Sequence, residues 1–140
     1  MAEIRIKKYV RYLFGLAFLV FVLNKLYLRP WVLKNELPYF FQVIVYSIPN
    51  FIEAIMGTTV ITGLSFRILR WSGKKISDFH IYLFSTGIAS IYVISQELKY
   101  HNIGGNNVYD PNDLIASILG LGMMLVFFQT FGFLEKKKIE

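Results

Sequence analysis

The chain has 140 residues, of which 55% are hydrophobic and 17% aromatic, and it carries a net charge of +6. Since a membrane-spanning helix needs about 20 mostly apolar residues, this length allows four spans and predicts a single transmembrane domain in a lipid bilayer. The absence of cysteine excludes disulfides, thiolate metal sites and cysteine nucleophiles. The basic residues lie in short clusters between apolar runs, so we expect no nucleic-acid partner.

Two apolar runs open the chain. The first predicts a span over residues 10–29, which we interpret as retained because no small-residue cleavage site follows it. The second run, residues 37–69, would measure about 50 Å as one helix and overshoot the membrane. Pro49 is the natural position for a break, because the first turn of a helix tolerates proline. We therefore predict an interfacial or re-entrant segment over residues 37–47 and a second span over residues 49–69.

Two more spans follow residues that favour the start of a helix. A Ser-Asp pair predicts a third span over residues 77–97, and Asp110 followed by Pro111 predicts a fourth over residues 111–134. The predicted fold class is an all-α polytopic membrane protein, a four-transmembrane-helix bundle with an interfacial or re-entrant segment before the second span. Eleven of the fifteen lysines and arginines lie on the side of the termini, so the positive-inside rule places both termini in the cytoplasm.

Polar side chains gather at the predicted outer end of these spans. Ionisable residues inside a membrane are costly, so we treat them as candidate functional positions. If the second span begins at Pro49, Glu53 lies about one turn inside it. Lys25, Arg29 and Lys99 are candidate partners for this carboxylate. The candidate ligand-binding residues are Asn50, Glu53, Gln96, Glu97, Asp110 and Asp113.

Three of these carboxylates also have a purely structural interpretation. Asp110 and Asp113 suit the start of a helix, and Glu97 suits an exposed position at a loop edge. Glu53, Glu97 and Asp113 are possible metal ligands. Small residues mark the faces where membrane helices pack closely. Because each of these acids lies on the same helix face as such residues, we expect the carboxylates to point into the bundle. The predicted packing positions are Gly57, Gly87, Ser90, Ala116 and Gly120.

We expect no enzyme activity and no cofactor. No residues have the spacing of a nucleophile, a base and an orienting group, and no glycine-rich phosphate loop is present. His80 and His101 are 21 residues apart, or about 30 Å along one helix, and cannot hold a haem between them. A hydrolase built from dispersed carboxylates stays open as an alternative.

The junction of the third and fourth predicted spans carries a family resemblance. Ser95-Gln96-Glu97 is followed by a Gly/Asn turn and then by Tyr109-Asp110-Pro111-Asn112-Asp113 and Ser117-Ile118-Leu119-Gly120. This resembles the VanZ-like family of small bacterial membrane proteins. Two features depart from the family pattern: Asn106 and Asn107 stand where an arginine is usual, and the Glu and Gln are adjacent. The resemblance implies a bacterial inner-membrane location, a role in the cell envelope and a link to resistance against the glycopeptide teicoplanin.

Three functions remain open at this level. In the first, the outer carboxylates of a non-catalytic VanZ-like envelope protein bind a cation, a lipid head group or a glycopeptide. In the second, the chain is a small ion- or proton-coupled transporter with Glu53 as the exchanging group. In the third, it is an accessory subunit that packs against a membrane-protein partner or forms a homo-oligomer.

Overall fold

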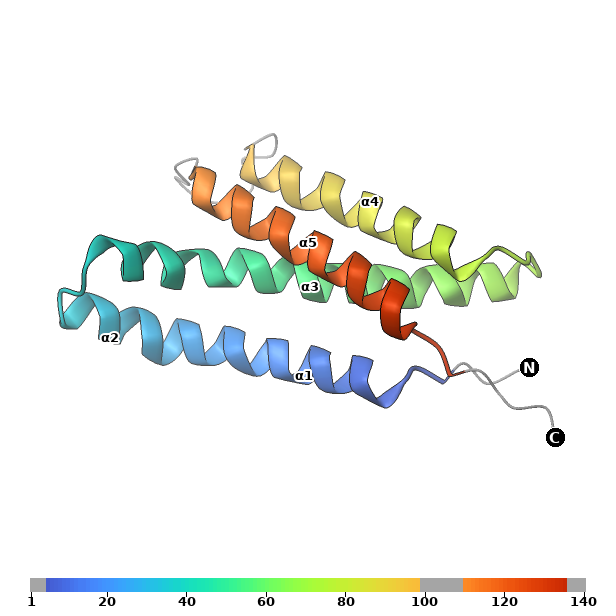
Figure 1. Ribbon diagram of the computed structural model, residues 1–140, viewed down its shortest axis with the longest axis horizontal. Coiled ribbons are helices and arrows are strands. Elements are labelled where there is room, and N and C mark those ends of the chain that lie inside the picture. Colours follow the sequence, from blue (N-terminus) through green and yellow to red (C-terminus); the bar gives the residue numbers. More distant parts are fainter. Residues whose placement is uncertain (1–4, 99–109, 136–140) are drawn as a thin grey trace.

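The computed structural model describes residues 5–98 and 110–135 and is helical through most of their length (Figure 1). A first helical run is followed by three separate helices, and Figure 1 shows these four segments lying along the long axis, with successive segments running in opposite directions. The all-helical architecture is confirmed. The elements are α1 (Lys8–Leu23), the π-helical η1 (Asn24–Leu28), α2 (Arg29–Lys34), α3 (Tyr39–Trp71), α4 (Asp78–Glu97) and α5 (Pro111–Phe131).

In the described part of the chain, three helical segments are long and apolar enough to cross a membrane: Lys8–Lys34, Tyr39–Leu69 and Pro111–Phe131. The predicted third span corresponds to α4, which has 20 residues but is more polar than the other three segments. The fold is therefore that of an α-helical protein with three candidate membrane spans and a fourth helix packed against two of them.

The break predicted at Pro49 is wrong, because α3 continues through this proline without interruption. Proline has no N–H to donate to the carbonyl four residues earlier, which is that of Val45. The buried side chain of Asn24 supplies the missing donor, with its Nδ2 atom 3.1 Å from the Val45 oxygen. Arg29 donates to the carbonyl of Tyr46 at 3.1 Å. Donors from η1 and α2 thus compensate for the proline, and residues 39–47 form the first turns of α3 instead of a separate segment.

The first helical run also extends beyond its predicted end. Its continuation contains η1, where the Arg29 N–H donates to the Asn24 carbonyl in the wider π-helical pattern. Pro30 then falls in the first turn of α2, where its missing N–H is tolerated. The helical run therefore reaches Lys34 rather than ending near residue 29.

Small and hydroxyl-bearing residues fill much of the space among α3, α4 and α5. Ser85 on α4 donates to Ser65 on α3 at 3.1 Å, and both side chains are buried. Gly120 on α5 allows the closest backbone approach, since an added Cβ would lie 2.6 Å from the Phe51 carbonyl oxygen. Close packing of this kind is typical of helices that associate inside a membrane. The buried hydroxyl side chains on these helices are Ser47, Thr58, Thr59, Thr62, Ser65, Ser85, Thr86 and Ser117.

Aromatic packing closes the bundle at the end where the two termini lie (Figure 1). Gly132 has a φ of 71°, so α5 ends at Phe131 instead of reaching residue 134 as predicted. The chain then turns and inserts Phe133, whose ring stacks on Phe66 at a centroid distance of 5.6 Å. Ile6 and Leu134 form an antiparallel bridge, which brings the two ends of the described chain together. The placement of both termini on the cytoplasmic side of a membrane stays a prediction.

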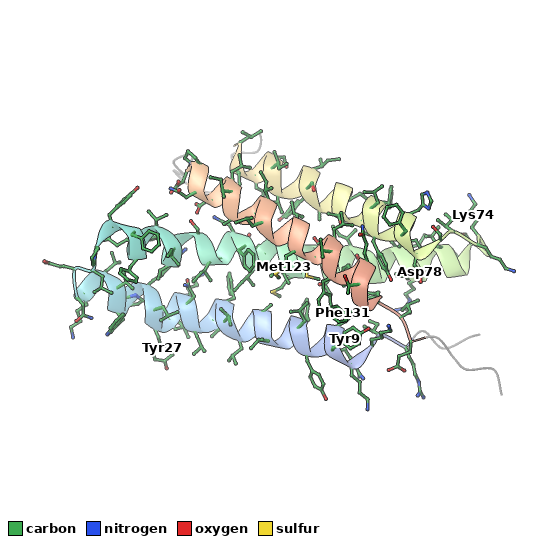
Figure 2. The ribbon with its side chains drawn as sticks, in the orientation of Figure 1. Tyr9, Tyr27, Lys74, Asp78, Met123 and Phe131 are labelled. Carbon is green, nitrogen blue, oxygen red and sulfur yellow. The ribbon has the colours of Figure 1, made fainter. Side chains whose placement is uncertain are left out.

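The outer surface of the helices is rich in large apolar side chains. Tyr27 is 66% exposed and points away from the other helices (Figure 2). Comparable exposed side chains occur on α1, α3, α4 and α5, among them Leu16, Phe18, Leu64, Ile68, Phe84, Ile91, Leu119 and Val126. The hydroxyl side chains thus lie inside the bundle and the large apolar side chains lie outside it. This distribution is expected of a protein whose surroundings are apolar.

Candidate functional site

The candidate site lies where α4 ends and α5 begins. Asp110 caps α5 as predicted, because its Oδ1 accepts a hydrogen bond of 2.9 Å from the Asn112 N–H. Pro111 then takes the first helical position. This start places Asp113 in the first turn, on the face that meets the other helices, where its side chain is half-buried.

Glu97 is the last residue of α4 and is also half-buried. Its carboxylate is close enough to three other acids to be repelled by them: Asp113 most strongly, then Glu53 and then Asp110. The structure therefore brings the other three predicted carboxylates within electrostatic range of Glu97. Asp113 exerts the strongest of these repulsions, and we call Glu97 and Asp113 the outer acidic pair.

Two buried oxygen atoms, one within the outer acidic pair and one next to it, have no hydrogen-bond partner among the described residues. One is Oδ1 of Asp113, and the other is Oγ of Ser117. Ser117 lies one turn further along the same face of α5 and is fully buried. Because a buried polar atom without a partner costs about 1–3 kcal/mol, the position of these two oxygens favours a donor or cation from outside the described chain.

The structure does not bring Glu53, Glu97 and Asp113, the possible metal ligands, together into one site. Among the residues that the structure describes, no three histidine or acidic side chains lie close enough together to hold a metal ion. The reason is the unbroken α3, which places Glu53 near the level of Gly120, about 10 Å further along the helix axes than Asp113. Glu53 is also exposed on the outside of α3, so the prediction that it points into the bundle is wrong as well.

The other predicted ligand-binding residues are not part of the outer acidic pair. Gln96 is exposed, and its amide donates to the Tyr92 hydroxyl at 2.7 Å along the same helix. Asn50 is half-buried on α3, near Glu53 in the helix. Among the three partners predicted for Glu53, Lys25 attracts its carboxylate, whereas Arg29 lies over the ring of Tyr46. The third, Lys99, falls outside the described residues.

The predicted packing positions divide into three groups. Gly120 is confirmed, since it touches both Phe51 and Ala54. Gly57 and Gly87 do not pack against another helix of the described chain, because a Cβ added at either position would meet nothing within 4 Å. Both glycines leave open space on the outside of the bundle. The other two positions are less informative: Ser90 donates to the Thr86 carbonyl of its own helix, and Ala116 is half-buried.

Sequence reasoning missed the buried polar contact between Asn24 and Val45. The sequence offered one indication: Asn24 lies inside the first apolar run, and Pro49 lies inside the second run, 25 residues later. Neither residue indicates by itself that they meet, since their contact depends on how α3 packs against η1.

The site and fold define a helical protein with three candidate membrane spans and an acidic pair at the end of the bundle away from the termini. No family model matches the chain, and no curated protein or solved structure is similar enough to match it.

Proposed function

We propose that the chain is a four-span envelope membrane protein that binds an ammonium group at the outer acidic pair without catalysing a reaction. The observation that carries this proposal is the buried Asp113 oxygen near the Glu97 carboxylate, for which residues 5–98 and 110–135 supply no hydrogen-bond donor. An ammonium group supplies both the positive charge and up to three N–H donors. Amine-bearing lipid head groups and glycopeptides are the ligand classes with this chemistry.

The distribution of side chains on α4 supports the proposal that this helix is a fourth membrane span. Its buried positions include Ser85, Thr86 and Ala89, whereas its outward positions carry large apolar side chains such as Phe84 and Ile91. The polar content of α4 is thus partly turned toward α3 and α5, and lipid would meet mainly hydrocarbon. We place the chain in a bacterial inner membrane because of the VanZ-like resemblance, and the excess of lysine and arginine near the termini favours cytoplasmic termini with the acidic pair outside.

The proposal is tested by measuring lipid binding to the full chain in nanodiscs. Native mass spectrometry would compare retention of phosphatidylethanolamine with that of phosphatidylglycerol, which lacks an amine. We expect preferential retention of phosphatidylethanolamine, reduced by Glu97→Gln and by Asp113→Asn. Glu135→Gln removes an acid at the opposite end and serves as the matched control. Equal retention of the two lipids, or equal loss in all three variants, would contradict the proposal.

Teicoplanin provides a second probe, because the VanZ-like resemblance implies this ligand class. A glycopeptide ligand predicts that teicoplanin competes with phosphatidylethanolamine for the wild-type chain but has no effect on the Asp113→Asn variant. Loss of lipid preference in the variant without competition by teicoplanin would identify the lipid alone as the ligand.

A second candidate function is proton-coupled transport, and the position of Glu53 favours it. Glu53 is the only charged residue between Tyr39 and Arg67 on α3 and is fourteen residues from each. A spanning α3 would therefore hold this carboxylate close to the middle of the membrane, where ionisable groups commonly relay protons. Proteoliposomes with an imposed proton gradient would show flux for the wild type and none for Glu53→Gln. Equal flux in both would exclude Glu53 as the coupling group.

A further inference from the structure

We propose that the outward face of α3 is the contact surface of a homodimer, in which Glu53 of each protomer pairs with Lys25 of its partner. The dimer does not depend on ligand binding at the outer acidic pair. The surface, which we call the Glu53 face, consists of Tyr46, Asn50, Glu53, Gly57, Val60 and Leu64.

These six residues follow one another at intervals of three or four along α3, so they form one continuous stripe. Four of them are exposed, and the other two, Asn50 and Gly57, are half-buried. The opposite side of α3 is occupied, because Phe51 and Ala54 pack against Gly120 of α5. Apart from Arg29 of α2, which lies over the Tyr46 ring, the other described helices therefore leave the Glu53 face largely uncovered.

A carboxylate in the middle of such a face is unfavourable in lipid. Intramembrane charges almost always face a bundle interior or a water-filled cavity and pair with another group. Glu53 makes no hydrogen bond or ion pair within the described chain, and Lys25 is the cation whose attraction reaches it. Covering the Glu53 face with another protein would remove this carboxylate from contact with hydrocarbon.

Gly57 gives that face the shape for close helix packing. It lies one turn from Glu53, and the space above its Cα is open to at least 4 Å from an added Cβ. Small residues in membrane helices let two backbones approach closely, and the approach also shortens the distance between polar groups on either side. The glycine and the carboxylate therefore suit the same contact.

A second copy of this chain matches the charges of the face. Lys25 on η1 is exposed and near enough to attract the Glu53 carboxylate, so one protomer presents a negative and a positive group in the same region. A twofold axis brings each group opposite its counterpart, because a twofold interface uses the same patch on both subunits. The result is an alternating set of two carboxylates and two ammonium groups with no net charge. Lipid would leave Glu53 uncovered, and a partner with charge of one sign would leave either Glu53 or Lys25 unmatched.

Single-cysteine crosslinking tests the contact directly, because the natural chain has no cysteine. Val60→Cys places a thiol on the Glu53 face, and Ile91→Cys places one on the exposed side of α4 as the matched control. In nanodiscs or native-like vesicles, oxidation should give a disulfide-linked dimer with Val60→Cys and a monomer with Ile91→Cys. Crosslinking of both variants to the same extent, or of neither, would overturn the proposal.

Substitutions test the roles of the glycine and the charges. Gly57→Leu should abolish the dimer seen by native mass spectrometry, whereas Gly87→Leu fills equally open space on α4 and should leave it intact. Glu53→Gln should raise the dimer dissociation constant about 3- to 20-fold, the range typical of polar contacts between membrane helices. Glu53→Lys should separate the protomers, and adding Lys25→Glu should restore the dimer. Failure of this restoration, with both variants folded as judged by circular dichroism, would refute the charge pairing.

Discussion

The hydrogen bond from Asn24 to the Val45 carbonyl accounts for the passage of α3 through Pro49, and it yields a quantitative prediction. In Asn24→Leu, the shape of the side chain is nearly preserved but the donor to Val45 is lost. A buried acceptor without a donor costs about 1–3 kcal/mol. The same substitution also removes Asn24 Oδ1, which has no partner of its own among the described residues and is costly to bury. The change in the free energy of unfolding caused by Asn24→Leu alone therefore combines two opposing contributions.

A double-mutant cycle with Pro49→Ala isolates the contribution of the hydrogen bond. Alanine restores the backbone N–H at position 49, which can donate to the Val45 carbonyl in the normal helical pattern. Asn24→Leu should then destabilise the protein less in the Pro49→Ala background than in the wild type. We expect a coupling of about 0.5–1.5 kcal/mol, the net value of one hydrogen bond. The measurement is reversible unfolding of all four variants in mixed micelles, followed by circular dichroism.

Additive effects would refute this role of Asn24 in the continuous helix. If the two substitutions sum to within about 0.3 kcal/mol, the Asn24 amide does not compensate for the proline. Asn24→Asp provides a further check, because it keeps the size of the side chain but removes the amide donor. Like Asn24→Leu, it should destabilise the protein less in the Pro49→Ala background than in the wild type.

Three further predictions concern the packing and the ends of the helices. Gly120→Ala should lower the free energy of unfolding in micelles by about 1–3 kcal/mol, because the added methyl would lie 2.6 Å from a backbone oxygen of α3; Gly122→Ala, which meets nothing within 4 Å, should not destabilise. Asp110→Ala should cost about 1 kcal/mol in the same assay through loss of the helix cap, whereas Asp110→Ser should retain most of the stability. Tyr82→Phe should cost about 0.5–1.5 kcal/mol and speed amide exchange at residue 133, whose N–H donates to the tyrosine hydroxyl at 2.9 Å; Tyr12→Phe, at an exposed ring, should change neither quantity.

The helical content and several helix boundaries follow from local sequence. Asp110 and Pro111 start α5 because capping and proline geometry involve only neighbouring residues. α4 also begins directly after Ser77 and ends at Glu97, as predicted, although the Ser77 side chain makes no capping hydrogen bond. The presence of acids at one end of the bundle also follows from sequence, since Glu97 and Asp113 adjoin the connection between α4 and α5.

Tertiary contacts decided the features that the sequence mispredicted. A proline near the middle of a long apolar run normally indicates a break, but α3 continues because Asn24, 25 positions earlier, donates to the carbonyl that Pro49 leaves free. Because α3 is continuous, Glu53 does not lie near the start of the helix, as predicted. It lies at the centre of a long segment of α3 that has no other charged residue. The outward direction of Glu53 and Gly57 depends on which side of α3 meets α5, and helical periodicity alone gives a stripe without saying what covers it.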